Sequence, residues 1–160
     1  MKKNLLEILE TEARAPVEKI AKRLGVTERE VRKTLEELEK TNVILGYRAV
    51  INPEKIEDEI VSAIIEVNIV PQRDRGFDAV AKRIYQFPEV KSCFLVSGPY
   101  DLLVFVDGKT LKEVATFVAE KLATLDAVQK TATHFLLKKY KQDGIMLIDE
   151  EKGERLAVTP

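Results

Sequence analysis

Apolar residues recur at helical spacing through the first third of the chain. They form three separate stripes, each spaced as on one face of an α-helix. Pro16 precedes the second stripe and is typical of a first helical turn. The stripes predict three helices, and their members are Leu5, Leu6, Ile8 and Leu9; Val17, Ile20, Ala21 and Leu24; and Val31, Leu35 and Leu38.

A short turn separates the second and third predicted helices. Gly25 is the residue type expected just past a helix end. Thr27, with Glu30 three positions later, forms a capping-box signature that starts the next helix at once. Two helices joined so closely cannot lie antiparallel. The segment therefore predicts a helix-turn-helix motif.

The hydrophobic period changes after residue 42. Residues 43–51 are rich in β-formers and predict a strand, which Asn52-Pro53 ends. Further strands are expected at 60–70, 90–96, 102–106 and 128 to about 139, and helices at 77–85 and 110 to about 124. This β-α-β-β-α-β order is the ferredoxin-like arrangement. The predicted fold is α+β, and its parts are a helix-turn-helix (winged-helix-like) domain at residues 1–52, a ferredoxin-like βαββαβ domain at 53–140 and a C-terminal extension at 141–160.

Two helices cover only one face of such a sheet. The other face must be covered by something outside the domain, and an exposed apolar face marks an interface. Symmetric homodimers are the commonest solution, so self-association is expected. The extension carries apolar patches at 145–148 and 156–158, which we expect to pack on the domain or on a partner.

Composition and charge refine this prediction. The 160 residues are 45% hydrophobic and 33% charged, which is enough apolar material for a core. No apolar stretch approaches the roughly 20 residues that span a bilayer, and neither a signal peptide nor a pair of cysteines is present, so a cytoplasmic protein is expected. The net charge is −1, but it divides into +2 for residues 1–52 and −3 for the rest. A basic first domain has the right sign for binding nucleic acid.

Several short segments together resemble the Lrp/AsnC (feast/famine) transcriptional regulators. The resemblance covers roughly residues 4–140, and its specificity lies in the order and spacing of the segments. It implies a homodimer that binds double-stranded DNA, assembles into tetramers or octamers and often senses an amino acid with its second domain. The matching segments are Ile20 to Thr27, Leu35 to Glu39, Val43 to Tyr47, Pro88 to Val90 and Ser97 to Leu102.

The third predicted helix carries the candidate DNA contacts. In this motif the start of the second helix of the pair enters the major groove. With the apolar stripe facing inward, Arg29 and Lys33 point outward and Arg32 lies on the flank. Thr27 at the helix N-terminus can meet a phosphate, and Lys22 and Arg23 can add backbone contacts. The alternative is a solvated charged face, since the helix is also rich in glutamate.

The segment from Ser97 to Asp101 is the candidate effector site. A Gly-Pro turn exposes backbone N–H groups that can hold a carboxylate, and Asp101 can bind an ammonium group, which together suit a free amino acid. The turn residues concerned are Ser97, Gly98, Tyr100 and Asp101. The resemblance implies that they and Thr131 and Thr133 line a pocket where two dimers meet. The alternative is an ordinary turn in which Asp101 caps backbone groups.

No catalytic or metal-binding motif is evident. His134 has no ligand partner at metal spacing, which favours a structural or interface role, and Cys93 fits a buried hydrophobe. Gly-rich phosphate loops, nucleophile elbows and paired-carboxylate motifs are missing, so we expect neither an enzyme nor a cofactor. Two alternatives stay open: an oligomeric effector-binding module that does not bind DNA, and a sirohaem-type decarboxylase, for which His134 and few arginines would be available.

Overall fold

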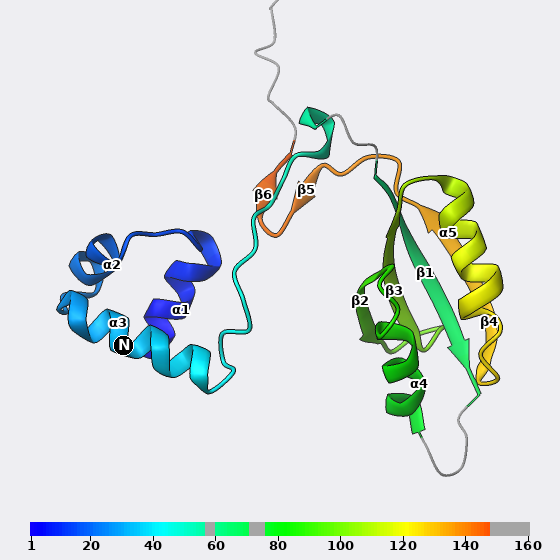
Figure 1. The fold of residues 1–160 in the computed structure, drawn as a ribbon, viewed down its shortest axis with the longest axis horizontal. Coiled ribbons are helices and arrows are strands. Elements are labelled where there is room, and N and C mark those ends of the chain that lie inside the picture. Colours follow the sequence, from blue (N-terminus) through cyan, green and yellow to red (C-terminus); the bar gives the residue numbers. More distant parts are fainter. Residues whose placement is uncertain (57–59, 71–75, 148–160) are drawn as a thin grey trace, which may run out of the picture. The chain divides into compact units, whose positions relative to one another are not determined.

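The computed structural model describes residues 1–56, 60–70 and 76–147. The chain forms two compact units, Met1–Ile51 and Asn52–Pro160, and each is described here by itself. The first unit is helical and the second contains a four-stranded sheet with helices (Figure 1).

The first unit consists of three helices: α1 (Lys2–Thr11), α2 (Val17–Leu24) and α3 (Glu28–Lys40). All three were predicted from their apolar stripes, and these stripes form the core of the unit. The buried side chains are Leu5, Ile8, Ile20, Ala21, Val31 and Leu38.

The turn between α2 and α3 confirms the predicted helix-turn-helix. Gly25 has φ of 66°, a left-handed conformation that glycine adopts without a Cβ clash. The N–H of Val26 donates to the carbonyl of Ala21 at 3.1 Å and closes the end of α2. At the start of α3, the N–H of Thr27 donates to Oε2 of Glu30 at 2.8 Å, and the N–H of Glu30 donates to the Thr27 hydroxyl at 3.3 Å. Both halves of the capping box are therefore formed.

Replacing Thr27 by alanine is expected to lower the free energy of unfolding by about 1 kcal/mol at neutral pH, because the α3 N-cap is lost. Hydrogen bonds from the Thr27 backbone and side chain lower the pKa of Glu30 from its ordinary 4.5. A lowered pKa stabilises the fold above the ordinary value, and this contribution is lost as the pH falls through the folded value. The difference between wild type and Thr27→Ala should therefore shrink in acid. Urea unfolding followed by helical circular dichroism measures it.

Thr116→Ala provides the control for this prediction. Thr116 is exposed on a helix, and its hydroxyl has no hydrogen-bond partner among the described residues. Removing it should not destabilise the protein. Equal losses in both variants would contradict the assigned role of the Thr27 cap.

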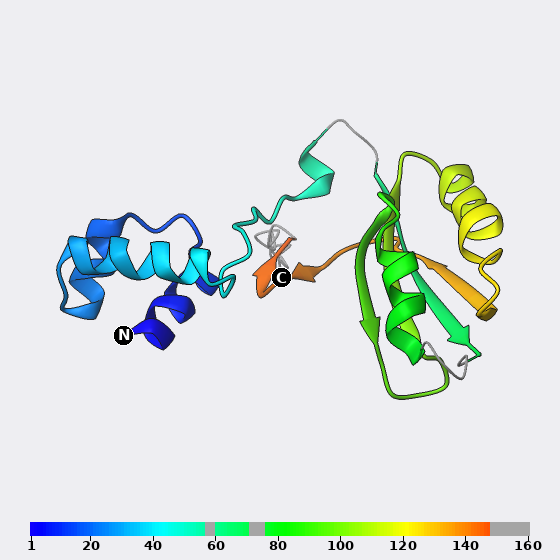
Figure 2. The same ribbon diagram turned by 60° about the horizontal axis from the view of Figure 1, so that its bottom comes forward.

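The second unit is built on an antiparallel sheet in the order β2-β3-β1-β4. A 3-10 turn at Pro53–Lys55 leads into it, and Figure 2 shows the unit from a second side. The order of elements is the predicted βαββαβ, and their bounds are β1 Val61–Ile69, α4 Gly76–Tyr85, β2 Val90–Leu95, β3 Leu102–Gly108, α5 Leu111–Phe117 and β4 Val128–Phe135.

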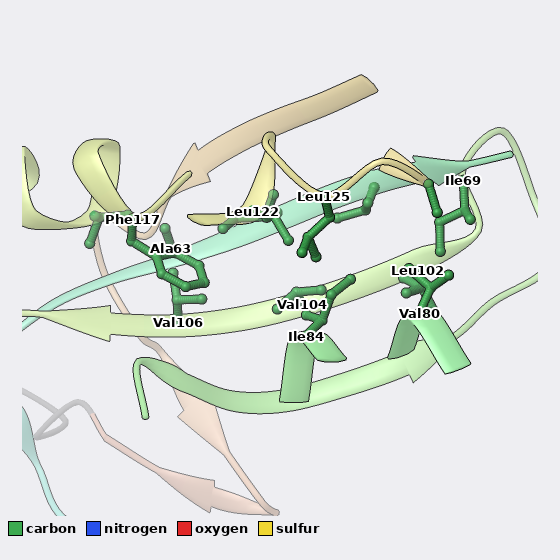
Figure 3. Packing of buried hydrophobic residues seen from close by; sticks show 14 residues of the cluster. Ala63, Ile69, Val80, Ile84, Leu102, Val104, Val106, Phe117, Leu122 and Leu125 are labelled. Atoms are coloured by element: carbon green, nitrogen blue, oxygen red, sulfur yellow. The ribbon is translucent and has the colours of Figure 1, made fainter. Parts of the chain in front are cut away.

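Alternate side chains of the strands form the core beneath the two helices. Along β1, Ala63, Ile65 and Val67 are buried, while the side chains between them point to the opposite face. Figure 3 shows this cluster, in which Val80 and Ile84 of α4 and Phe117 of α5 pack with residues of β1 and β3. The helices therefore cover one face of the sheet, as predicted. The other face has no covering element among the described residues.

Three predicted elements differ from the structure. The strand expected at 43–51 is wrong: these residues contain neither helix nor strand, because a strand needs a neighbouring strand and the described chain provides none. The helix expected from 110 ends at Phe117 and continues as a π-helical turn, Val118–Leu122. The last strand ends at Phe135, four residues before the expected position.

A small hairpin follows the last strand of the sheet. It consists of β5 (Lys141–Gln142) and β6 (Ile145–Met146), joined by Asp143 and Gly144 with φ of 49° and 83°. Beside it, the amide of Asn52 donates to the carbonyl of Leu147 at 2.9 Å, and Leu147 is buried. The residue that follows the hairpin is therefore bonded to the start of the second unit. The predicted patch at 156–158 and residue Ile148 lie outside the described residues.

Candidate DNA-binding surface and effector turn

The burial of α3 determines which of its side chains face solvent. Val31, Thr34 and Leu38 are at most 3% exposed and fix the inward face of the helix. At 100° per residue, Arg29 and Lys33 lie opposite them, and both are exposed. The outward face predicted from the sequence is therefore present on the folded helix.

The glutamates of α3 are mostly engaged by neighbours in the same unit. The N-terminal helix supplies one partner, because Nζ of Lys2 lies 2.6 Å from Oε1 of Glu37. This hydrogen bond and the charge of Lys2 lower the pKa of Glu37. The Tyr47 hydroxyl donates to Oε1 of Glu39 at 2.9 Å; partial burial, with this bond, raises the pKa of Tyr47. The remaining glutamate, Glu36, is exposed on the outward face and has no partner among the described residues.

The two arginines of α3 differ in their partners. Arg32 lies 3.2 Å from Glu28, one turn earlier, in an exposed ion pair of small energetic value. Arg29, Lys33, Lys22 and Arg23 are exposed and have no ion pair among the described residues. Four cations are therefore available to a phosphate or base edge, and Arg32 can exchange its weak partner.

Thr27 has a different environment from the other candidates. Its hydroxyl lies 2.7 Å from Oε2 of Glu30, inside the capping box. A carboxylate beside the hydroxyl repels an approaching phosphate. The structure thus gives Thr27 a role in starting α3, and its phosphate contact stays a prediction.

The turn at Ser97–Asp101 is anchored to β1. The N–H of Asp101 donates to the carbonyl of Val67 at 3.0 Å, and its Oδ2 accepts from the N–H of Ile69 at 2.7 Å. The amide of Asn68 donates to the carbonyl of Pro99 at 2.8 Å. Asp101 therefore caps backbone groups, which is the second role considered for it. Only Oδ2 of the Asp101 carboxylate accepts this structural bond. Ser97 and Gly98, earlier in the turn, are exposed.

Gly98 has φ of 149°, which favours glycine over residues with side chains. Tyr100 is half-buried beside it. The tip of the turn, Ser97 to Pro99, is exposed to solvent.

The two threonines predicted for the effector site lie on β4. Thr131 pairs with Val67 and Thr133 with Ile65, so β1 separates both from β3 and its turn. Two strand spacings amount to about 10 Å. Within one chain the structure therefore does not bring the threonines into contact with the turn.

A cavity of about 510 Å³ lies at the other end of β3. Val106, Val114 and Phe117 supply its apolar wall, and an ion pair between Lys121 and Glu89 lies at its edge. The hydrogen bond from Lys121 lowers the pKa of Glu89. None of the residues predicted for the effector site lines this cavity.

The uncovered face of the sheet combines apolar side chains with one charged pair. Phe94 and Phe105 meet edge to face at 6.0 Å, and Phe94 is 53% exposed. Nε2 of His134 lies 3.2 Å from Oε1 of Glu66. His134 was a candidate from the sequence, whereas Glu66 was missed, although the alternation along β1 places Glu66 on this face. The uncovered face is defined here as Ile64, Glu66, Phe94, Leu103, Phe105, Ala132 and His134.

Other candidate chemistry is weak in the described residues. Cys93 points toward the core side of the sheet, and burial raises the pKa of its thiol. No group of three or more potential metal ligands occurs in the described ranges. None of the helices in the part of the chain that the structure describes is long and apolar enough to cross a membrane.

The arrangement of α2 and α3 places the first unit among the helix-turn-helix domains, a class in which the second helix of the pair enters the major groove of DNA. Comparison with known proteins narrows the class. The AsnC-type helix-turn-helix domain matches residues 3–39, and the Lrp/AsnC ligand binding domain matches residues 62–146. The chain belongs to the Lrp/AsnC family of transcriptional regulators.

Individual relatives agree with this assignment. The uncharacterized HTH-type transcriptional regulator YugG of Bacillus subtilis is 46% identical over 157 residues, which cover 98% of this chain and 95% of YugG. The regulator LrpA of Pyrococcus horikoshii is 32% identical over 139 residues, covering 87% and 96% of the two chains. These relatives are transcriptional regulators, so the expectation that the chain is not an enzyme is confirmed.

Solved structures show the same fold. The transcriptional regulator NMB0573 of Neisseria meningitidis, in complex with L-methionine, superposes with a TM-score of 0.70 at 25% identity. The match covers 88% of this chain and 90% of that protein. The predicted α+β fold, with a helix-turn-helix followed by an antiparallel sheet domain, is confirmed.

Proposed function

We propose that the protein regulates transcription by binding specific double-stranded DNA sequences through the start of α3. The observation that carries the proposal is that four of the five glutamates of α3 have partners, while Arg29 and Lys33 of α3 and Lys22 and Arg23 of α2 are exposed and have no ion pair among the described residues. The proposed contacts are Arg29, Arg32 and Lys33 to bases or phosphates, with Lys22, Arg23 and Thr27 at the backbone. Residues 1–52 serve DNA binding, 53–140 serve effector binding and oligomerisation, and 141–160 form an extension.

The active form that we propose is a homodimer formed through the uncovered face, with tetramers or octamers built from it. The exposed aromatic side chains of this face mark an interface. In a twofold-symmetric dimer, the same face of the second copy buries them. The face also carries one carboxylate, Glu66 of β1, beside the imidazole of His134 of β4. Two helix-turn-helix units then read two half-sites. Such a regulator works in the cytoplasm, where the DNA lies.

A free amino acid is the effector that we propose for the turn at Ser97–Asp101. NMB0573 is a relative in fold that was solved with L-methionine, which supports this chemical class. The exposed N–H groups of the turn suit a carboxylate, and the second oxygen of Asp101 suits an ammonium group. Thr131 and Thr133 contribute only if another copy supplies them, because β1 separates them from the turn of their own chain.

Genome-wide footprinting with and without amino acids tests the whole proposal. Sites protected by the protein, with occupancy that changes on adding an amino acid, are expected. An effector-binding module without DNA binding would protect no site and would still bind an amino acid. The glutamates of α3 motivate this second candidate, and the ion pairs of Glu28 and Glu37 argue against it.

The effector turn gives a separate prediction. A cognate amino acid at a hundred times its Kd should stabilise the wild type by about 2.7 kcal/mol, visible as a rise in Tm. Asp101→Asn should abolish most of this rise, because an amide is a poorer partner for an ammonium group. Thermal unfolding with each of the twenty amino acids measures the effect.

Asp107→Asn is the matched control, since this aspartate accepts from Ser62 at the far end of β3. Its response to the amino acid should equal that of the wild type. The Tm of each variant without ligand separates a damaged turn from lost binding. No stabilisation of the wild type by any amino acid would contradict an effector of this class.

A further inference from the structure

We infer that the assembly of two copies through the uncovered face is controlled by protonation of His134, so that the dimer forms more strongly as the pH falls from about 8 to about 6. The inference rests on the proposed homodimer and adds a regulatory input to it. Glu66 and His134 are the residues that carry it.

The register of the sheet isolates Glu66 among apolar neighbours. Glu66 pairs with Leu103 of β3 on one side and with Ala132 of β4 on the other. His134 is one diagonal step away, with Nε2 at 3.2 Å from Oε1 of Glu66. Within the described residues this histidine is the only ion-pair partner of Glu66.

In a single chain, water hydrates the charged carboxylate of Glu66. The Glu66 side chain is 34% exposed and the His134 side chain is 59% exposed, so water can hydrate both. A second copy laid over the face removes this water. A buried carboxylate without a cation is strongly destabilising, whereas a paired one is tolerated. Association therefore favours the protonated imidazole, and each copy takes up to one proton.

Other charged groups near the face do not replace His134. Lys130 of β4 lies opposite Asn68, on the other diagonal from Glu66, but forms no ion pair with Glu66 in the described residues. Lys91 lies at the irregular pairing between β2 and β3. Asp107 of β3 accepts from the Ser62 hydroxyl at 2.7 Å. None of these side chains changes charge between pH 6 and 8 at its usual pKa. Histidine does, and the chain contains only this one.

The sign of the effect follows from linkage. Because the dimer binds more protons than two separate chains, its association constant must fall as the pH rises through neutrality. The fall is limited to a factor of about 100 per pH unit when two protons are taken up in full. We expect at least a tenfold fall between pH 6 and pH 8.

Analytical ultracentrifugation of the full chain over this pH range is the test, with two variants. Glu66→Gln removes the charge that needs a cation and leaves a protonated His134 without a partner, so dimerisation of this variant should not strengthen as the pH falls. His134→Gln leaves Glu66 without its cation, and should therefore dimerise weakly at both. The NMR signals of the single histidine should also titrate at higher pH in the dimer than in diluted monomer.

The outcomes separate the two proposals. A wild type that dimerises equally at pH 6 and pH 8, or a His134→Gln variant that keeps the wild-type pH dependence, overturns this inference alone. A wild type that is monomeric at every pH overturns the homodimer as well. Circular dichroism shows whether each variant is folded. If His134→Gln does not fold, the pH dependence of Glu66→Gln tests the inference by itself.

Discussion

Replacing Arg29, Arg32 and Lys33 together by alanine is expected to abolish specific DNA binding and to leave the protein folded and dimeric. Each arginine that contacts a base contributes about 1 to 3 kcal/mol, and a dimer loses every contact twice. The affinity for the operator should therefore fall by at least about a thousandfold. All three side chains are exposed, so the core of the first unit is unaffected. Gel shifts on operator DNA measure the loss, and ultracentrifugation checks the dimer.

A matched triple variant controls for charge alone. Lys82, Arg83 and Lys112 are exposed on helices of the second unit and have no ion pair among the described residues. Their replacement by alanine removes the same three charges and should change specific binding little. If both triple variants bind the operator equally, α3 is not the reading element.

Single replacements separate the roles within α3. Loss of an arginine that reads a base should relax sequence preference at one position, whereas loss of a lysine on phosphate should weaken all sequences equally. The slope of log affinity against log salt should also decrease by about one for each phosphate contact removed.

Placing glutamate at both Phe94 and Phe105 is the change expected to affect assembly most. Both rings lie on the uncovered face, where each new carboxylate would be buried without a partner in a dimer. A buried unpaired charge costs about 3 to 5 kcal/mol. The variant should be monomeric in ultracentrifugation at concentrations where the wild type is dimeric. It should also bind the operator weakly, because two half-sites are no longer bound together.

Leu137→Glu is the control for this variant. Leu137 is 97% exposed and lies after the last strand of the sheet, so a charge there is hydrated in any state that leaves this segment free. It should assemble like the wild type. A Phe94→Glu, Phe105→Glu double variant that stays dimeric would place the interface elsewhere.

The elements that the sequence predicts correctly are those defined by neighbours in the chain. Gly25, Thr27 and Glu30 fix the end of α2 and the start of α3 through bonds that span five residues or fewer. The alternation along β1 and the stripe of α4 likewise depend on local period. Such local patterns can be interpreted from the sequence without knowledge of the tertiary structure.

The strand wrongly predicted at 43–51 depends on contacts that are distant in sequence, whereas the π-helical turn at Val118–Leu122 and the β5–β6 hairpin are local. Residues 43–51 have strand-forming side chains but no neighbouring strand in the described chain. The β5–β6 hairpin could have been recognised, because Asp143-Gly144 is a typical two-residue hairpin turn.

The site was predictable to the same extent. The outward position of Arg29 and Lys33 follows from helix geometry alone. The engagement of Glu37 by Lys2 joins residues 35 positions apart, and no sequence pattern indicates it. The hydrogen bond between Asp101 and Ile69 and the ion pair of Glu66 with His134 could be predicted only from the register of the sheet.

The two hydrophobic clusters of the chain share no residue: one is built from α1, α2 and α3, and the other from β1 to β4, α4 and α5. Substitutions in one cluster therefore leave the packing of the other unchanged. In evolutionary terms, the two units can diverge at different rates or be exchanged between relatives. A chimera carrying residues 1–51 of another regulator should therefore fold and, under the proposed function, bind the operator of that regulator while keeping the effector response of this second unit.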